Sequence, residues 1–194
     1  MLHDVEPIAN SHKINEGHEK QENGNKILDQ LTGRSNVSRN RFFGLQGHTS
    51  GEHNLLDSEV LNVNGLNHAK KGQILDAVLC FQKAVDLNPN NFKAWFNYGT
   101  GLTKIGKFDD SSLYCFEKAL EIDPNDAEVW NSKGSVLYAN GKREEAFACY
   151  KRSVELAPTN GRAWQNMGVL IEKLGNKKSA KECYNRAAEA RLLV

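Results

Sequence analysis

Long hydrophobic runs are missing from this chain of 194 residues. No apolar stretch approaches the roughly 18 residues that a membrane-spanning helix needs, and the N-terminus has no apolar segment typical of a secretory signal peptide. An excess of one charge is also missing, because 25 Lys and Arg residues balance 24 Asp and Glu residues. We therefore expect a cytoplasmic protein with no membrane association and no electrostatic field that would attract nucleic acid.

Catalytic motifs are missing as well. The sequence has no phosphate-binding loop, dinucleotide fingerprint, nucleophile elbow or H-E-x-x-H motif. The segment HTSGEH (residues 48–53) contains two histidines, but their spacing differs from that of a zinc motif. The acidic pairs Asp109-Asp110 and Glu144-Glu145 are expected at helix N-termini, where the helix dipole favours negative charge without a catalytic role. We therefore predict no enzymatic activity and no cofactor.

Cysteine is scarce, and no C-x-x-C pair occurs. Equivalent residues of stacked helices lie about 10 Å apart, whereas a disulfide needs Cα atoms within about 7 Å and zinc needs its ligands around one point. Five of the six histidines precede the repeats described below at irregular spacing, which also argues against a metal site. We predict small, partly buried thiols with no metal or redox role. They occupy one repeat position: Cys80, Cys115, Cys149 and Cys183.

The sequence does contain one unit of 34 or 35 residues that recurs four times. The copies are residues 58–91, 92–126, 127–160 and 161–194. A fixed period of this length is typical of stacked helix pairs, in which each unit buries its apolar face against its neighbours. Four positions carry most of the pattern. They are Leu61, Trp95, Trp130 and Trp164 at position 4; Gly65, Gly99, Gly134 and Gly168 at position 8; Gly72, Gly106, Gly141 and Gly175 at position 15; and the rings of Phe81, Phe116, Tyr150 and Tyr184.

Each copy predicts two helices joined by a tight turn. The glycine at position 8 allows two helix backbones to approach closely, and the glycine at position 15 suits a turn with positive φ. Pro89, Pro124 and Pro158 end the second helices, and the Asn and Asp residues after them cap the next helix. The expected helices cover residues 57–71, 74–87, 92–105, 108–121, 126–139, 142–155, 160–174 and 177–190.

This pattern resembles the tetratricopeptide repeat, W-x2-L-G-x2-Y, then A-x3-F, then P, over residues 58–194. The resemblance implies an all-α fold, a right-handed superhelical α-solenoid of four helix-turn-helix units, behind a disordered N-terminal tail of residues 1–57. The chain departs from the pattern at Leu61, and by one extra residue near Asp109, which should bulge the entry to a second helix.

The resemblance also implies a concave groove lined by the first helix of each unit. We interpret Phe96 and Tyr138 as aromatic anchors for a peptide, and Asn62, Asn131 and Gln165 as a row of amides for its backbone. The alternative is that these side chains only satisfy neighbouring helices. The candidate peptide-binding residues are Asn62, Leu66, Lys70, Phe96, Thr100, Lys104, Asn131, Ser135, Tyr138, Gln165, Val169 and Lys173.

Some members of the family hold the C-terminal carboxylate of heat-shock chaperones with a clamp of two Lys, two Asn and one Arg. Tested from the first copy, the corresponding residues include one match, Asn97, and tested from the second copy they match no better. We therefore do not expect a chaperone-tail adaptor. The residues at these positions are Asn62, Leu66, Asn97, Glu128 and Ser132 from the first copy, and Phe96, Thr100, Ser132, Arg162 and Asn166 from the second.

The two ends of the repeat array leave alternatives open. Residues 26–31 fit a short helical turn, whereas residues 34–45 combine three Arg residues with Phe42, Phe43 and Leu45. The second segment is a solvated tail, a contact for RNA or anionic surfaces, or a linear motif that folds back on the repeats or engages another protein. At the other end we expect an uncapped apolar face, which implies a homo-oligomer, stacking on a partner, or a longer array. Its residues are Ala187, Ala188, Leu192, Leu193 and Val194.

Three functions are compatible with this sequence. The first is a non-catalytic scaffold that binds a protein or peptide in the groove. The second is an assembly protein that acts through its C-terminal helix. The third is a regulatory module of a separate or truncated enzyme.

Overall fold

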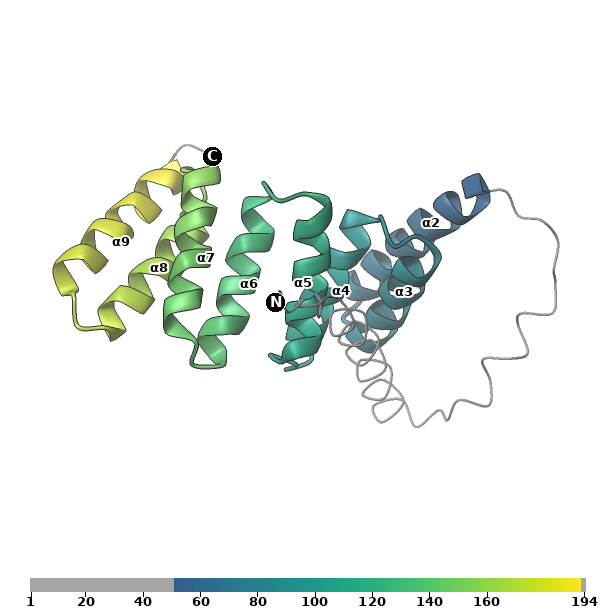
Figure 1. Ribbon diagram of the computed structural model, residues 1–194, viewed down its shortest axis with the longest axis horizontal. Coiled ribbons are helices and arrows are strands. Elements are labelled where there is room, and N and C mark those ends of the chain that lie inside the picture. Colours follow the sequence, from purple (N-terminus) through teal and green to yellow (C-terminus); the bar gives the residue numbers. More distant parts are fainter. Residues whose placement is uncertain (1–50, 193–194) are drawn as a thin grey trace, which may run out of the picture. The chain divides into compact units, whose positions relative to one another are not determined.

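The computed structural model describes residues 51–192, and this part of the chain consists of eight α-helices without a strand (Figure 1). The predicted tail segments before residue 51, together with Leu193 and Val194, lie outside the described residues. The helices are α2 (Gly51–Lys70), α3 (Ile74–Leu87), α4 (Phe92–Lys104), α5 (Asp110–Ile122), α6 (Ala127–Ala139), α7 (Arg143–Leu156), α8 (Gly161–Lys173) and α9 (Lys177–Leu192).

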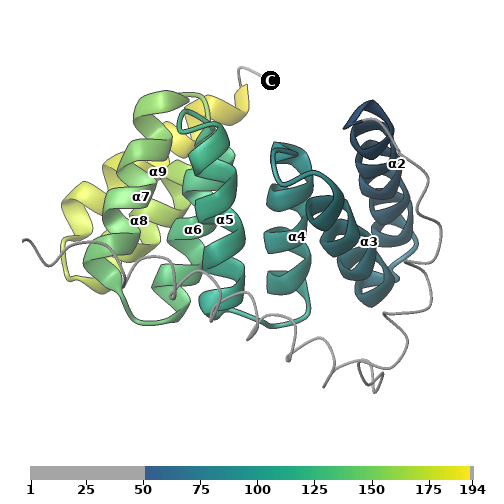
Figure 2. The same cartoon turned by 45° about the vertical axis from the view of Figure 1, so that its right-hand side comes forward.

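The helices form four antiparallel pairs that follow one another in a row (Figure 1; Figure 2). The first helices, α2, α4, α6 and α8, contact one another in order, and each of α4, α6 and α8 also packs against the second helix of the preceding pair. This is an α-solenoid, and the predicted fold class is confirmed. Within residues 51–192, no helix combines the length and the apolar character required to cross a membrane.

One boundary differs clearly from the prediction. Helix α2 begins at Gly51, six residues before the predicted start, so residues 51–57 are helical and do not belong to a tail. No proline or glycine lies between Glu52 and Asn64 to interrupt the helix. The extra residue of the second copy lies in the connection at residues 105–109, where Asp109 Oδ1 accepts the N–H of Ser111 at 3.0 Å.

Each helix pair is held at close range by contact between a glycine and an aromatic ring. A Cβ atom built at Gly65, Gly99, Gly134 or Gly168 would lie 2.5–2.8 Å from the nearest ring carbon of the second helix. No real Cβ fits at that distance, so only glycine permits this helix separation. The rings are those predicted from the repeat: Phe81, Phe116, Tyr150 and Tyr184.

The turns and caps also follow the prediction. The glycines at position 15 have φ between +76° and +89°, which other residues rarely adopt. Asn91, Asp126 and Asn160 accept backbone N–H groups of the first turns of α4, α6 and α8 at 2.8–3.1 Å.

One recurring interaction was not foreseen from the sequence. The indole Nε1 of each repeat tryptophan donates a hydrogen bond to the carbonyl of the proline six residues earlier, at 2.8–2.9 Å. This bond fixes each connection to the helix that follows it. The donors are Trp95, Trp130 and Trp164, and the acceptors are Pro89, Pro124 and Pro158.

The C-terminal end differs from the prediction of an apolar face. Ala187 and Ala190 are only 5% and 4% exposed because they pack inward in the last helix pair. Among the described residues of α9, the exposed positions are mostly Lys, Glu, Asn and Arg, with the exception of Ala188 and of Leu192, which is 86% exposed. The described outer face of α9 is therefore mostly polar. The prediction of exposed apolar side chains is wrong for Ala187 and is confirmed for Ala188 and Leu192.

We predict that Gly134→Ala lowers the free energy of unfolding by about 1–2 kcal/mol, because the new methyl group overlaps the Tyr150 ring in a closely packed core. Its Cβ would lie 2.7 Å from Cε1 of Tyr150, a residue that is 2% exposed. Urea unfolding followed by circular dichroism measures the change. In a Tyr150→Ala background the same substitution should no longer destabilise, since the obstructing ring is gone. An equal cost in both backgrounds would contradict this interpretation.

Candidate functional site

The candidate peptide-binding residues all lie on the first helices of the four pairs. Their exposure divides them into three groups. Asn62 and Asn131 are buried, whereas Phe96, Thr100, Ser135 and Tyr138 are half-buried. The exposed group contains Leu66, Lys70, Lys104, Gln165, Val169 and Lys173.

The buried asparagines hold neighbouring repeats together. Asn97 Nδ2 donates to Asn62 Oδ1 at 2.8 Å, which joins α4 to α2. Asn166 Nδ2 donates to Asn131 Oδ1 at 2.9 Å, which joins α8 to α6. The prediction that Asn62 and Asn131 offer amides to a peptide is therefore wrong, because position 5 of one first helix faces position 6 of the next.

Gln165, the third amide of the predicted row, is exposed. Its Oε1 accepts a hydrogen bond from Nη2 of Arg191 at 2.7 Å. This contact links α8 to the end of α9 rather than to a following repeat. Its oxygen is engaged, and it lies at the surface where a ligand group can compete with an exposed guanidinium.

Phe96 takes the place of the asparagine at the junction of the second and third repeats. Its ring lies 6.2 Å from the ring of Phe116, centroid to centroid, at 50°. The next first helix, α6, carries Ser132 where the other junctions have Asn97 or Asn166. The hydrogen bond between two asparagine side chains is therefore absent from this junction. Phe96 and Tyr138 therefore present partly exposed rings on two adjacent first helices, α4 and α6.

The two hydroxyl candidates differ in their partners. Ser135 Oγ donates to the Asn131 carbonyl at 3.0 Å and lies 3.4 Å from the Tyr150 hydroxyl. Within the described residues, Thr100 Oγ1 is buried and has no hydrogen-bond partner. A buried hydroxyl without a partner costs free energy, because it loses its hydrogen bonds to water.

Three exposed lysines occupy position 13, at the ends of α2, α4 and α8. A cation in the last turn interacts favourably with the helix dipole, so Lys70, Lys104 and Lys173 each have a structural explanation. None of them forms an ion pair with another residue of the described part. The three charges are therefore also available to an acidic ligand.

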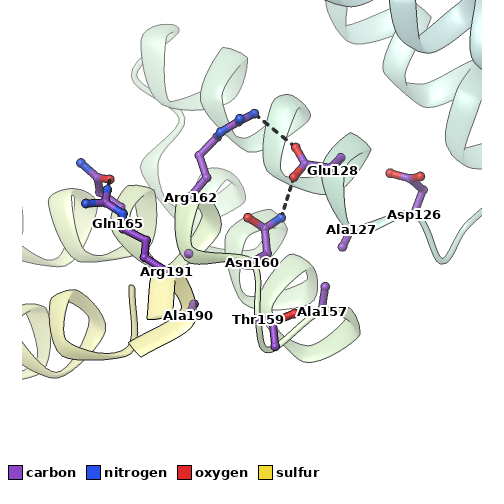
Figure 3. A pocket seen from close by; sticks show the side chains of 11 residues that line it. Asp126, Ala127, Glu128, Ala157, Thr159, Asn160, Arg162, Gln165, Ala190 and Arg191 are labelled. Carbon is purple, nitrogen blue, oxygen red and sulfur yellow. Dashed lines mark hydrogen bonds and ion pairs between the residues drawn. The ribbon is translucent and has the colours of Figure 1, made fainter. Parts of the chain in front are cut away.

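A pocket of about 850 Å³ opens between the third and fourth repeats (Figure 3). Asp126 and Glu128 lie at the start of α6, Asn160 and Arg162 at the start of α8, and Arg191 near the end of α9. The pocket was not predicted from the sequence, although Gln165 was placed in the groove, because its walls combine the starts of α6 and α8 with the end of α9.

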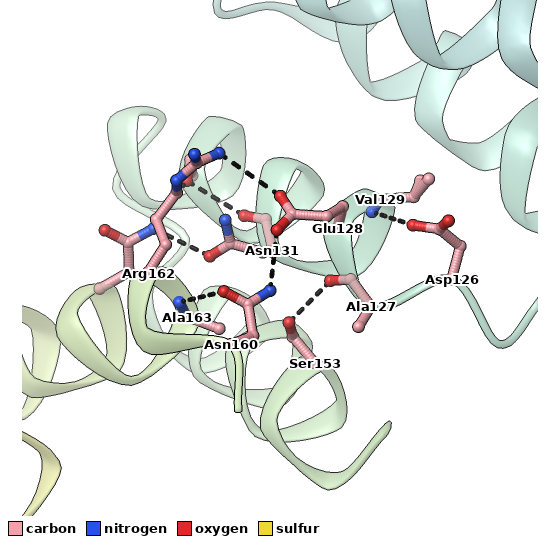
Figure 4. Close-up of polar contacts among 11 residues, drawn as sticks. Asp126, Ala127, Glu128, Val129, Asn131, Ser153, Asn160, Arg162 and Ala163 are labelled. Carbon is pink, nitrogen blue, oxygen red and sulfur yellow. Dashed lines mark hydrogen bonds and ion pairs between the residues drawn. The ribbon is translucent and has the colours of Figure 1, made fainter. Parts of the chain in front are cut away.

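Two of the charged side chains that line this pocket, Glu128 and Arg162, are paired with each other (Figure 4). Glu128 accepts a hydrogen bond from Asn160 Nδ2 at 3.1 Å and forms an ion pair with Arg162 at 3.4 Å. Asn160 also caps α8, and Asp126 caps α6. These contacts give the pocket a structural role at the repeat junction.

The four cysteines are free thiols. Cys115, Cys149 and Cys183 are buried and Cys80 is half-buried. Burial raises the pKa of all four thiols, in the case of Cys149 to about 11. The thiolate is the reactive form, so these residues are poor nucleophiles at neutral pH. Within residues 51–192, no group of three or more His, Cys, Asp or Glu side chains is arranged to hold a metal ion.

Models of the tetratricopeptide repeat match this sequence at residues 59–91, 80–111, 127–160 and 149–182. Together the matches cover more than half of the chain. A TPR repeat-containing protein of Schizosaccharomyces pombe is 36% identical over 45 residues, which are 23% of this chain and 6% of that protein.

Solved structures show the same fold. The crystal structure of MamA superposes with a TM-score of 0.65 at 21% identity, and the match covers 70% of this chain and 78% of that one. The first TPR domain of Spaghetti (RPAP3), bound to an HSP90 peptide, superposes with a TM-score of 0.60 at 24% identity, covering 62% of this chain and 94% of that one.

We predict that Thr100→Val raises the free energy of unfolding by about 1 kcal/mol, because it removes a buried, unpartnered hydroxyl at constant volume. The matched control is Thr103→Val, which should not stabilise, since Thr103 Oγ1 donates to the Thr100 carbonyl at 2.8 Å. Urea unfolding compares the two variants with the parent chain. Equal destabilisation by both substitutions would disprove the assignment.

Thiol labelling tests the burial of the cysteines. At pH 8 we expect Cys80 to react with iodoacetamide at least about tenfold faster than Cys115, because exposure and thiolate fraction both control the rate. Peptide mass spectrometry gives the rate for each site, and labelling in guanidinium provides the reference in which the four sites react alike. Fast reaction of Cys115 in the folded chain would show that the helix pair opens readily.

Proposed function

Because this chain belongs to the tetratricopeptide repeat family, we propose that it is a non-catalytic protein-interaction scaffold. Its ligand is a peptide segment of another protein, held on the side formed by α2, α4, α6 and α8. The fold supports this function, since a stack of helix pairs presents a continuous surface built from one helix per repeat.

The observation that carries the proposal is the pair of aromatic residues on adjacent first helices. Phe96 and Tyr138 are half-buried, so each ring is held in place by its own repeat while part of it remains available to a ligand. Fixed, partly exposed aromatic side chains are typical of binding hot spots, because they contribute contact area at a low cost in conformational entropy.

The charge at the edge of this surface favours an acidic segment. Lys70, Lys104 and Lys173 are exposed and have no ion pair within the described residues. Opposite charge on the ligand accelerates association and selects among partners, and its effect weakens with salt. We therefore assign the ligand class as a peptide with Asp or Glu residues beside an apolar anchor.

This mode of binding differs from capture of a chaperone C-terminus. The structure of the Spaghetti domain contains an HSP90 peptide, but in this chain Asn97 is the only clamp residue matched from the first repeat, and its Nδ2 donates to Asn62. The other four positions tested from the first repeat carry neither Lys nor Arg; they are Asn62, Leu66, Glu128 and Ser132. We therefore propose recognition of an internal segment rather than of a terminal carboxylate.

Mutation of the two aromatic residues tests the proposal. A labelled peptide selected from a display library against the parent chain should bind Phe96→Ala and Tyr138→Ala at least about tenfold more weakly, the effect expected of a hot-spot residue. Fluorescence polarisation measures the dissociation constants. The matched control is Phe147→Ala, which removes a 37% exposed phenylalanine from the second helix α7 and should leave affinity unchanged.

Two results would count against this site. Unchanged affinity in both Phe96→Ala and Tyr138→Ala, with helical content preserved, would place recognition elsewhere. If the affinity is the same at 50 mM and at 500 mM salt, the lysines do not contribute to binding, since screened charges lose most of their attraction.

A further inference from the structure

Helix α2 carries an apolar face that no other described element covers. The side chains on this face are 38–62% exposed. At 100° per residue they fall within an arc of about 140°, next to the buried side that contains Ser58, Asn62 and Gly65. Several large apolar side chains gathered on one helix face usually mark a contact surface. We call these five residues the α2 patch: Leu55, Leu56, Val60, Val63 and Leu66.

The other repeats show what normally covers this face. Val60 stands at position 3 and is 57% exposed, whereas Ala94, Val129 and Ala163 at the same position are 0% exposed. These three residues are covered because α4, α6 and α8 each pack against the second helix of the preceding pair. Helix α2 has no preceding helix among the described residues, so the α2 patch is the place where a preceding segment would lie.

The α2 patch ends before the last turn of the helix. In the later repeats the apolar face continues to position 10, where Gly101, Val136 and Leu170 are buried. In α2 this position is Asn67, which is exposed, and Asn64 three residues earlier is exposed as well. The α2 patch therefore covers about three turns, from Leu55 to Leu66, or roughly 17 Å along the helix. A segment that covers it would therefore contact residues 55–66 and leave the last turn of α2 exposed.

We propose that residues 41–45, Arg-Phe-Phe-Gly-Leu, fold back and bury Phe42, Phe43 and Leu45 against the α2 patch. Five residues, 46–50, separate Leu45 from the start of α2 at Gly51. Extended, they allow a reach of about 20 Å. Val60 lies about 14 Å along the helix from Gly51, so the segment reaches the middle of the patch. The connection of residues 88–91 makes a comparable reversal with four residues.

Charge favours this segment over a second copy of the chain. Asp57 and Glu59 are exposed on α2 beside the α2 patch, and Arg39 and Arg41 precede the two phenylalanines. A symmetric dimer through the same face would instead bring the acidic residues of both copies together. Attachment to α2 also gives the segment an effective concentration of about millimolar, which a second copy reaches only at high protein concentration.

The segment would complete the array at its N-terminal end. It would supply the apolar cover that a preceding helix gives to α4, α6 and α8, with two aromatic rings in place of a full repeat.

Photo-crosslinking of the full chain tests this inference. Benzoylphenylalanine replaces Phe43, and equal amounts of unlabelled and ¹⁵N-labelled chains are mixed before irradiation. We expect cross-links from position 43 to residues 55–66 within a single isotopic species. Val60→Ser should reduce their yield at least about fivefold, because it removes apolar surface at the centre of the patch. The matched control Val169→Ser, at a 36% exposed valine of α8, should leave the yield unchanged.

Hydrogen exchange of the unmodified chain provides a second measurement. The double substitution Phe42→Ser and Phe43→Ser should accelerate exchange of the α2 amides at least about tenfold and leave α8 unchanged, since uncovered terminal helices open more readily. Val37→Ser, a change of the same kind outside the segment, should have no effect.

Three results would overturn the proposal. Cross-links between differently labelled chains would assign the α2 patch to a second copy. Cross-links to α2 from benzoylphenylalanine at Ile27 but not at position 43 would assign it to residues 26–31. Cross-links from position 43 to residues outside 55–66, with unchanged exchange in the double variant, would show that the patch is covered by something else.

Discussion

The contact between a glycine and an aromatic ring sets the geometry of this protein. In every pair the ring occupies the space that a Cβ would need, and a Cβ at Gly65 would lie 2.5 Å from Phe81. The same contact four times gives four pairs of similar shape, and pairs of similar shape can stack regularly. The alignment of α2, α4, α6 and α8 as neighbours, and hence any surface that they form together, depends on this contact.

Because the repeats stack regularly, the helices in the middle of the array are buried in similar ways, and differences in exposure are found at the first and last helices. Interior helices cover one another, so residues such as Val129 are buried by the repeat itself. Among residues 51–192, α2 and α9 each have a neighbouring pair on one side only, and they differ: α9 turns Lys, Glu and Arg residues outward, whereas α2 turns Val60 and Val63 outward. A polar helix face is well hydrated, whereas exposed apolar side chains are stabilised when another segment covers them.

The sequence was sufficient for the features that depend on local chemistry. Glycine turns, proline stops and Asn or Asp caps act within a few residues, and all helix boundaries except the start of α2 were predicted to within two residues. That start was missed because no repeat register exists before Ser58. The Trp–Pro hydrogen bonds had a visible signal, a proline six residues before each tryptophan. The predictions that Asn62 binds a peptide and that Ala187 is exposed were wrong. A periodic pattern indicates on which side of a helix a residue lies, but not which residue of a neighbouring helix it contacts.

Contacts between repeats also explain why the junction of the second and third repeats is our candidate for peptide recognition. At the two neighbouring junctions an asparagine pair uses position 5 for stacking, as in the bond from Asn97 to Asn62 at 2.8 Å. A side chain committed to the array has little capacity left for a ligand. Phe96 stands in place of that asparagine, so this junction has no hydrogen bond between asparagine side chains, and part of the Phe96 ring is exposed. This departure from the neighbouring junctions is the reason that binding is proposed here and not at the asparagine pairs.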